Sequence, residues 1–183
     1  MNKLQIGLIV GSLRKASINH QLAHAVIKLA PPDVSFKFIE IGDLPLYNQD
    51  DDDHQSKSVK RMKQEVTDCD GVLFITPEHN RSIPGVLKNA LDHGSRPPGK
   101  NSWGGKPAAI IGLSPSPVGT AIAQQHLRGV LAALDMPTLC QPEMFLQLKE
   151  GFFDADANIG AGGQKFFKAW MDRLVAWMSA HQG

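Results

Sequence analysis

Short apolar runs alternate along this chain with segments in which apolar residues recur every three or four positions. The first run, Leu4–Val10, is interrupted only by Gln5 and Gly7, which is typical of a strand buried on both faces of a parallel sheet. Segments with the longer spacing are typical of helices that bury one face. The predicted strands are residues 4–10, 35–41, 71–76, 106–113 and 137–140, and the predicted helices are residues 18–30, 56–69, 85–93, 121–134 and 164–180.

This alternation predicts an α/β fold, an open five-stranded parallel sheet with helices on both faces. At 183 residues the chain has the size of one domain, and we expect residues 1–183 to form it. A strand order of 2-1-3-4-5 places the first, third and fourth strands side by side. Polar loops follow these three strands, at residues 11–19, 76–84 and 113–120. Because the carboxyl ends of parallel strands meet at one edge, we expect the loops to form a single ligand site.

The loop after the first strand carries four polar side chains: Ser12, Arg14, Ser17 and Asn19. Ser17 can cap the following helix, whose unpaired N–H groups and positive dipole end attract anions. Hydroxyls, an amide and a guanidinium can complete the coordination of a phosphate. The loop lacks both G-x-x-x-x-G-K-[ST] and G-x-G-x-x-G, so a terminal monophosphate is favoured over a triphosphate or a dinucleotide. The alternative is an ordinary strand–helix loop with a serine cap and a solvated arginine.

Charge and cysteine content argue against several classes of function. The net charge is +1, which does not favour nucleic acid or an anionic membrane as a partner. No apolar run approaches the roughly 18 residues of a membrane span, and the first strand begins too early for a signal peptide. Cys69 and Cys140 are isolated and lack metal-binding spacing. We therefore expect a cytoplasmic protein without a metal site.

Three further features each have two interpretations. Residues 48–54 contain four consecutive aspartates that could hold a hard cation, but without the alternating spacing of a calcium loop they favour a solvated loop. Glu40 could bind the ribose of a dinucleotide, but without the glycine fingerprint an exposed strand residue is favoured. Large apolar residues at helical spacing in 164–180 favour packing against the sheet or a subunit over a surface that stacks on a cofactor.

Two longer motifs carry a family resemblance. Residues 11–19, Gly-Ser-Leu-Arg-Lys-Ala-Ser-Ile-Asn, resemble the phosphate loop of the NADPH-dependent FMN reductase family. Members of this family are flavodoxin-like reductases of quinones, chromate and azo compounds. Residues 76–92, Thr-Pro-Glu-His-Asn-Arg-Ser-Ile-Pro-Gly-Val-Leu-Lys-Asn-Ala-Leu-Asp, resemble the second signature of that family. The similarity continues, in order, over roughly residues 3–145. It implies a flavodoxin-like fold and an FMN cofactor.

The resemblance also implies which residues bind FMN. The first loop would hold the phosphate, the second would line the isoalloxazine ring largely through backbone groups, and the loop after the fourth strand would close the other side. The residues implied are Ser12, Arg14, Ser17, Ile18, Asn19, Pro77, Glu78, His79, Asn80 and Ser114. The chain departs from the family at His79, where tyrosine is usual, and at His93, where an aromatic residue is common. For either histidine taken alone, a neutral hydrogen-bonded residue is favoured over an acid–base catalyst.

The implied reaction is hydride transfer. No side chain can accept a hydride, so we predict no catalytic residue and assign the electron chemistry to FMN. We expect FMN to take a hydride from NADPH or NADH and to pass electrons at the same face to a small-molecule acceptor such as a quinone, chromate or an azo compound. This shared face predicts ping-pong kinetics. Arg96 and Lys100 could contact the 2′-phosphate of NADPH or face water.

The quaternary state and the class of activity also follow as expectations. The leucine-rich segment 127–134 and the resemblance predict a homodimer or homotetramer. One alternative function is a flavodoxin-like electron carrier, although such carriers tend to be strongly acidic and this chain is not. Another is a flavin-free nucleotide-binding module, because a fold alone does not determine a function.

Overall fold

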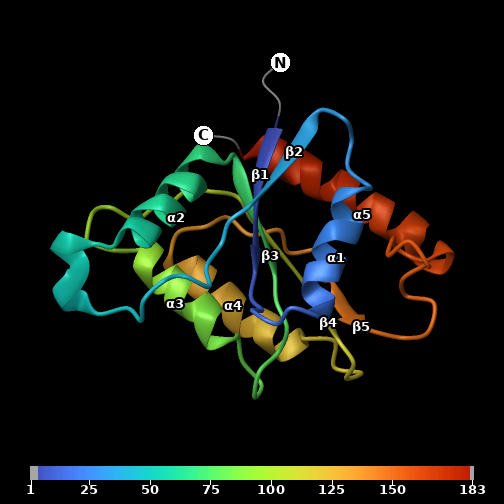
Figure 1. Cartoon of the computed structure of the whole chain (residues 1–183). Helices are drawn as coiled ribbons and strands as arrows, with labels where there is room; N and C mark the ends of the chain where they lie inside the picture. The colour runs from blue at the N-terminus through green and yellow to red at the C-terminus, as the bar shows by residue number, and fades with distance from the viewer. Residues whose placement is uncertain (1–3, 182–183) are drawn as a thin grey trace.

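A five-stranded parallel sheet lies at the centre of the molecule, with helices packed on both of its faces (Figure 1). The computed structural model describes residues 4–181. The sheet order is β2-β1-β3-β4-β5, and every neighbouring pair is parallel, which confirms the predicted fold class and strand order. The strands are β1 (Leu4–Val10), β2 (Val34–Phe38), β3 (Gly71–Ile75), β4 (Ala108–Ser114) and β5 (Phe145–Gln147). The helices are α1 (Ile18–Ile27), the 3-10 helix η1 (Gln49–His54), α2 (Lys57–Asp68), α3 (Gly85–Gly94), α4 (Ala121–Ala133) and α5 (Ala161–Ala180).

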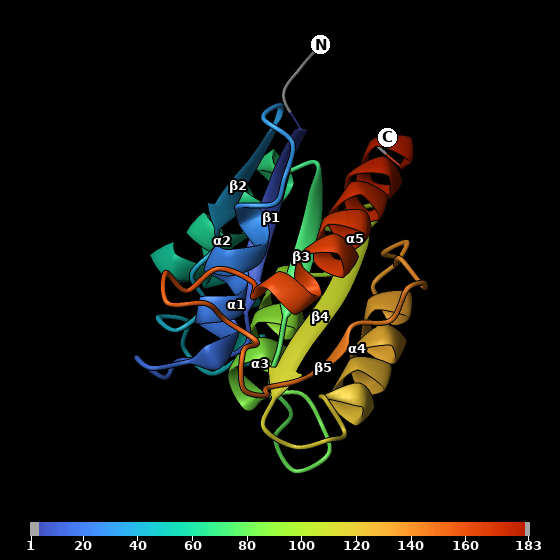
Figure 2. The ribbon, with the colours of Figure 1, turned by 90° about the vertical axis from the view of Figure 1, so that its right-hand side faces the viewer.

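Each face of the sheet has its own hydrophobic core. Helices α1 and α5 cover one face, where Leu22 and Trp170 are buried against β1, β3 and β4. Helices α2, α3 and α4 cover the other face, with Met62, Leu87 and Leu127 fully buried. Figures 1 and 2 show the two layers of helices on opposite sides of the strands. All five residues of β3 are buried, as its unbroken apolar run predicts.

The predicted fifth strand is wrong. Residues 137–140 form only an isolated bridge, in which Thr138 faces Ala108, and the strand that completes the sheet lies at Phe145–Gln147. Pro137 and Pro142 bracket the first segment, and neither has an N–H group to donate to a ladder. The segment therefore pairs only with Ala108, the first residue of β4, and the ladder with the far end of β4 forms after Pro142.

Helix ends differ from the prediction by a few residues, and the leucine-rich segment 127–134 is not the exposed surface that was expected to bind a second subunit. Helix α5 begins at Ala161, ahead of the predicted start at residue 164, and includes Gly162 and Gly163 although glycine is a weak helix former. Its apolar residues pack against the sheet, as favoured from the sequence. Leu127 and Leu131 are also fully buried in the chain's own core. The leucine pattern that predicted self-association is thus used within the chain.

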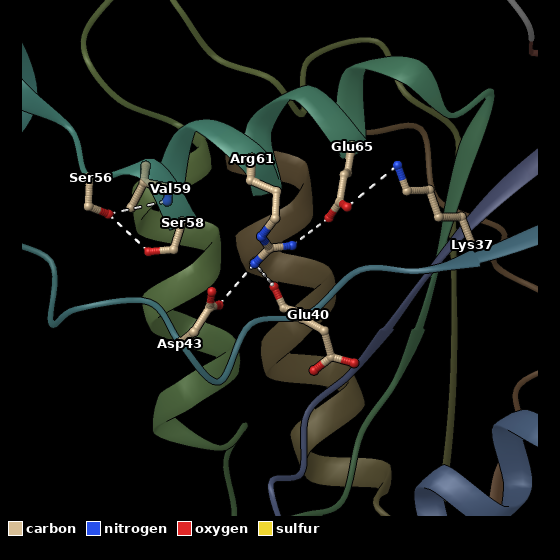
Figure 3. A network of polar contacts seen from close by, with 8 residues as sticks. All are labelled: Lys37, Glu40, Asp43, Ser56, Ser58, Val59, Arg61 and Glu65. Carbon is tan, nitrogen blue, oxygen red and sulfur yellow. Dashed lines mark hydrogen bonds and ion pairs between the residues drawn. The ribbon is translucent and has the colours of Figure 1, made fainter.

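Polar contacts attach α2 to the end of β2 (Figure 3). Arg61 donates hydrogen bonds to the carboxylate of Glu65 at 2.6 Å, the backbone carbonyl of Glu40 at 2.8 Å and the carboxylate of Asp43 at 2.9 Å. Lys37 of β2 also reaches Glu65, at 3.5 Å. Glu40 therefore contributes its carbonyl to this contact; it is exposed, as predicted, but it lies after β2 and not within the strand.

The aspartate-rich segment folds as η1 and has no buried residue. Among residues 4–181, no three histidine, cysteine, aspartate or glutamate side chains are placed so that they could hold a metal ion. None of the helices in the described part of the chain combines the length and apolarity needed to cross a membrane.

Candidate active site

The three polar loops meet at the carboxyl edge of the sheet, as predicted. They enclose a cavity of about 250 Å³. Its lining residues are Ser12, Arg14, Ala16, Ser17, Ile18, Asn19, Pro77, Glu78, His79, Leu113, Ser114 and Pro115. Nine of the ten residues implied to bind FMN are thus brought together, and the tenth, Asn80, lines an adjoining cavity. Open α/β sheets bind their ligands at this edge, where the order of the strands reverses.

The first loop is built around the N-terminus of α1. Ser17 caps the helix, and its side chain accepts a hydrogen bond from the backbone N–H of His20 at 3.4 Å. The ring Nε2 of His20 lies 2.9 Å from the carbonyl oxygen of Ser12, so this nitrogen carries a proton and donates it. The first turn of α1 has no acidic residue, and Arg14 forms no ion pair within residues 4–181. The loop therefore offers unopposed positive charge beside buried hydroxyl groups, which suits an anion.

Gly11 is required where this loop leaves β1. A Cβ atom at this position would lie 2.9 Å from the hydroxyl oxygen of Thr76 and 3.3 Å from the side chain of Leu87. The backbone N–H of Gly11 also donates to the carbonyl of Ile75 at 2.9 Å. The first two loops thus start in direct contact, because only glycine allows this approach.

Asn19 has a role that the sequence did not indicate. Its side-chain nitrogen donates to the carbonyl oxygen of Leu113 at 2.9 Å, and its side-chain oxygen accepts from the N–H of Leu113 at 3.0 Å. Asn19 is 1% exposed and Leu113 is fully buried. The amide therefore joins the start of α1 to the end of β4, two walls of the cavity that are 94 positions apart in sequence.

The second loop contains a tight turn. The backbones of His79 and Ser82 exchange two hydrogen bonds of 2.9 Å, and the two residues between them, Asn80 and Arg81, have φ angles of 50° and 65°. Positive φ at both central positions is the geometry of a type I′ turn. Ser82 also approaches His126 of α4, whose Nδ1 lies 3.1 Å from its hydroxyl oxygen.

Glu78 turns its carboxylate toward α4. One carboxylate oxygen accepts hydrogen bonds from the N–H groups of Ile122 and Ala123, both at 3.1 Å, and the other pairs with Arg81 at 3.1 Å. Thr120, the residue at the start of α4, makes no side-chain cap of its own. Glu78 thus stabilises the N-terminus of α4 in its place.

A second, open cavity of about 620 Å³ adjoins the first. The two share Glu78 and Ser114, and the second is lined in addition by Asn80, Arg81, Ser116, Val118 and Thr120. Sequence reasoning identified the loops at 76–84 and 113–120 but did not single out Arg81 or Thr120. Both have positive φ angles, which no sequence motif here signals for residues other than glycine.

The other residues considered from the sequence lie outside these cavities. His93 of α3 is 4% exposed, and its Nε2 lies 2.9 Å from the carbonyl oxygen of Pro45, so it is the hydrogen-bonded residue that was favoured. Arg96 and Lys100 follow the C-terminus of α3, whereas loop 76–84 precedes its N-terminus. The ten residues of α3 separate them from that loop by about 15 Å. Within one chain they do not reach the cavities.

Comparisons with known proteins agree with this geometry. The chain is 53% identical to a 2-hydroxy-1,4-benzoquinone reductase from Burkholderia sp., over 96% of each protein. It superimposes on the flavoenzyme NAD(P)H:(acceptor) oxidoreductase FerB from Paracoccus denitrificans with a TM-score of 0.93 and 41% identity, covering 97% of this chain and 98% of that one.

A flavodoxin from Pseudomonas aeruginosa shares the fold alone, with a TM-score of 0.57 and 17% identity over 98% of this chain and all of that one. The sequence profile of NADPH-dependent FMN reductases matches residues 4–150, which include all three loops of the site. Since the match covers most of the chain and the loops form one groove at the carboxyl edge of the sheet, this protein belongs to the NADPH-dependent FMN reductase family.

Proposed function

We propose that the protein binds FMN in the groove formed by the two cavities and uses it to reduce quinones with NAD(P)H. The observation that carries this proposal is the meeting of Ser12, Arg14 and Ser17 at the N-terminus of α1, directly beside the second cavity. Cofactor pockets commonly measure about 300–1,000 Å³, and the groove falls within that range.

The donors in the first cavity fit the phosphate of FMN. Ser12 and Ser17 supply hydroxyl groups, Arg14 supplies a guanidinium, and the start of α1 supplies backbone N–H groups. Ile18 and Asn19 shape the floor of this cavity, and Asn19 positions it through its contacts with Leu113. The ring of FMN would be held by Pro77 and His79 of the first cavity, by Asn80 of the second, and by Glu78 and Ser114, which line both.

When bound, FMN supplies two-electron transfer between NAD(P)H and an acceptor. The chain's own residues hold the loops in place, since the turn at 79–82 closes one loop on itself, and the cap by Glu78 and the bridge by Asn19 each attach a loop to another element. No described side chain in the groove is needed as an acid or base, because the second cavity is open and water can deliver protons to a reduced quinone.

The proposed acceptor class follows from the relatives. The Burkholderia relative acts on 2-hydroxy-1,4-benzoquinone by its name, and its identity to this chain extends over 96% of both proteins. We propose a quinone of this kind as an acceptor, and either NADPH or NADH as donor. Chromate and azo compounds are further candidates from the sequence. Family membership favours a reductase over the alternative of an electron carrier.

A homodimer or homotetramer stays a prediction. Its basis in the sequence is weaker than expected, because Leu127 and Leu131 are buried within one chain. The large apolar side chains exposed for a contact between subunits, among residues 4–181, are Leu13, Leu46, Ile122 and Phe166. Sedimentation of the flavin-loaded protein measures the state directly.

The function is tested by the spectrum and kinetics of the purified protein. We expect flavin absorbance bands after dialysis, and NAD(P)H oxidation that depends on an added quinone. Double-reciprocal plots should be parallel, because donor and acceptor use the same open cavity in turn. A colourless protein that cannot be loaded with FMN, or a loaded protein that does not oxidise NAD(P)H with any quinone, would contradict the proposal.

A further inference from the structure

Arg81 stands at the rim of the open cavity in a conformation that its residue type disfavours. It is the second central residue of the turn between His79 and Ser82, and its φ angle is 65°. Turns of this type normally place glycine there, after an asparagine such as Asn80, because a side chain makes the left-handed conformation costly. Strained residues of this kind are often retained for a function at the site where they stand.

Arg81 lines the open cavity, and its positive charge is only partly balanced. Its side chain is 65% exposed, and one of its nitrogens pairs with Glu78 at 3.1 Å. The other oxygen of Glu78 is held by two N–H groups of α4, so the positive end of that helix already balances part of its charge. The remaining N–H groups of Arg81 make no hydrogen bond to any described residue, and apart from Arg81 and Glu78 the side chains lining this cavity are uncharged.

Ionised hydroxyquinones match this arrangement. A hydroxyl group on a quinone ring is a vinylogous carboxylic acid, so 2-hydroxy-1,4-benzoquinone is ionised at neutral pH and shares the negative charge among its oxygens. A guanidinium can donate two parallel hydrogen bonds to two adjacent oxygens. It also favours the addition of electrons to a ring that already carries negative charge.

We propose that Arg81 determines acceptor specificity by binding the anionic oxygens of an ionised hydroxyquinone at the rim of the second cavity. This inference rests on the proposed quinone reductase function. In the overall reaction NAD(P)H gives up one hydride equivalent and becomes NAD(P)⁺, and solvent gives two protons. The hydroxyquinone anion then becomes neutral benzene-1,2,4-triol, with the carbonyl oxygens converted to hydroxyl groups.

The test compares two acceptors that differ in charge and little in size. The first is 2-hydroxy-1,4-benzoquinone, and the second is its methyl ether, 2-methoxy-1,4-benzoquinone, which has no proton to lose. Arg81→Gly removes the cation and installs the residue that the turn prefers, whereas Arg81→Lys keeps the charge but loses the fork. Arg173→Gln, at an exposed position on α5, is the control for a general loss of charge.

We expect Arg81→Gly to lower the ratio of kcat/KM for the hydroxyquinone to that for the methyl ether by about 10- to 100-fold, the effect of losing a charge-assisted hydrogen bond. Arg81→Lys should lower this ratio less, and Arg173→Gln should leave it unchanged. In the wild type, but not in Arg81→Gly, the ratio should fall at high salt. Calorimetric titration of the oxidised protein with the hydroxyquinone, without NAD(P)H, should show the same loss of affinity.

Other outcomes separate the inference from the function on which it rests. A wild type that reduces the methyl ether confirms quinone reduction. If Arg81→Gly then lowers kcat/KM equally for both quinones, or for neither, the specificity role is wrong and the reductase function stands. If it raises instead the KM for NADPH but not for NADH, Arg81 binds the 2′-phosphate and the inference is also wrong. A flavin-loaded wild type that reduces neither quinone contradicts both proposals.

Discussion

Asn19→Asp tests whether one buried amide holds two walls of the flavin groove together. The protonated form of the new carboxyl group can reproduce both hydrogen bonds of the amide, by accepting from the N–H of Leu113 and donating to its carbonyl oxygen. The ionised form cannot, because its second oxygen would lie where the amide nitrogen is now, 2.9 Å from that carbonyl oxygen. Burial and this repulsion both raise the pKa of the new carboxyl group above its ordinary value.

The magnitude follows from the difference between the pKa in the folded and unfolded states. Position 19 is 1% exposed, and fully buried carboxyl groups show shifts of several units. A rise of about two to three units corresponds to a loss of about 3–4 kcal/mol at neutral pH. Because the folded-state pKa is the higher one, the variant should have nearly wild-type stability below about pH 4, the unfolded value, and lose it as the pH rises through the folded value.

The assay is urea unfolding of wild type, Asn19→Asp and Asn19→Ala at about pH 4 and about pH 7. Asn19→Ala should lose about 1–3 kcal/mol for each of the two backbone groups that it leaves unpaired, at both pH values. The FMN affinity of Asn19→Asp should fall with its stability, because Leu113 lines the cavity. The reasoning is refuted if Asn19→Asp matches the wild type at neutral pH, or if its deficit is the same at both pH values.

Three further predictions concern the groove, the sheet and a surface turn. Arg14→Ala should weaken FMN binding by about 1.5–3 kcal/mol, and a variant as yellow as wild type after dialysis would contradict the phosphate assignment. Gly112→Ala should lower the free energy of unfolding by about 1–3 kcal/mol, because the new Cβ would lie 2.3 Å from two threonine oxygens. Thermal melting measures this loss, and Gly129→Ala, where no atom lies within 4 Å of the new Cβ, is the control. Hydrogen bonds from the backbone and side chain of Asn158, and from the backbone of Asp156, lower the pKa of Asp154, so this residue stabilises the fold above its unfolded pKa and the effect is lost as the pH falls through the folded value. Asp154→Ala should therefore be less stable than wild type at neutral pH, and unfolding curves in acid should converge.

Local patterns in the sequence were sufficient for the central part of the fold. The apolar runs of β1, β3 and β4 identify buried parallel strands, because residues buried on both faces leave no polar alternation. Ser17 was identified as the cap of α1 from local sequence, because a capping serine accepts its hydrogen bond from a backbone N–H only three residues later, here that of His20. The meeting of the three loops also follows from strand order, since polar loops after neighbouring parallel strands share an edge.

Contacts between distant segments decided the rest. The motif predicts Asn19 as a phosphate ligand, but its amide binds the backbone of Leu113. Glu78 caps α4, a helix that begins more than 40 positions later. The position of β5 depended on which segment after Pro142 reached the free backbone groups of β4. The strand propensity of single residues does not encode this. The sequence by itself determined which segments form strands, helices and polar loops, because these depend on neighbours within one or two turns. Only the tertiary structure decided which polar groups are left to bind a ligand, because a side chain such as Arg81 faces the cavity or a partner according to residues far away in the chain.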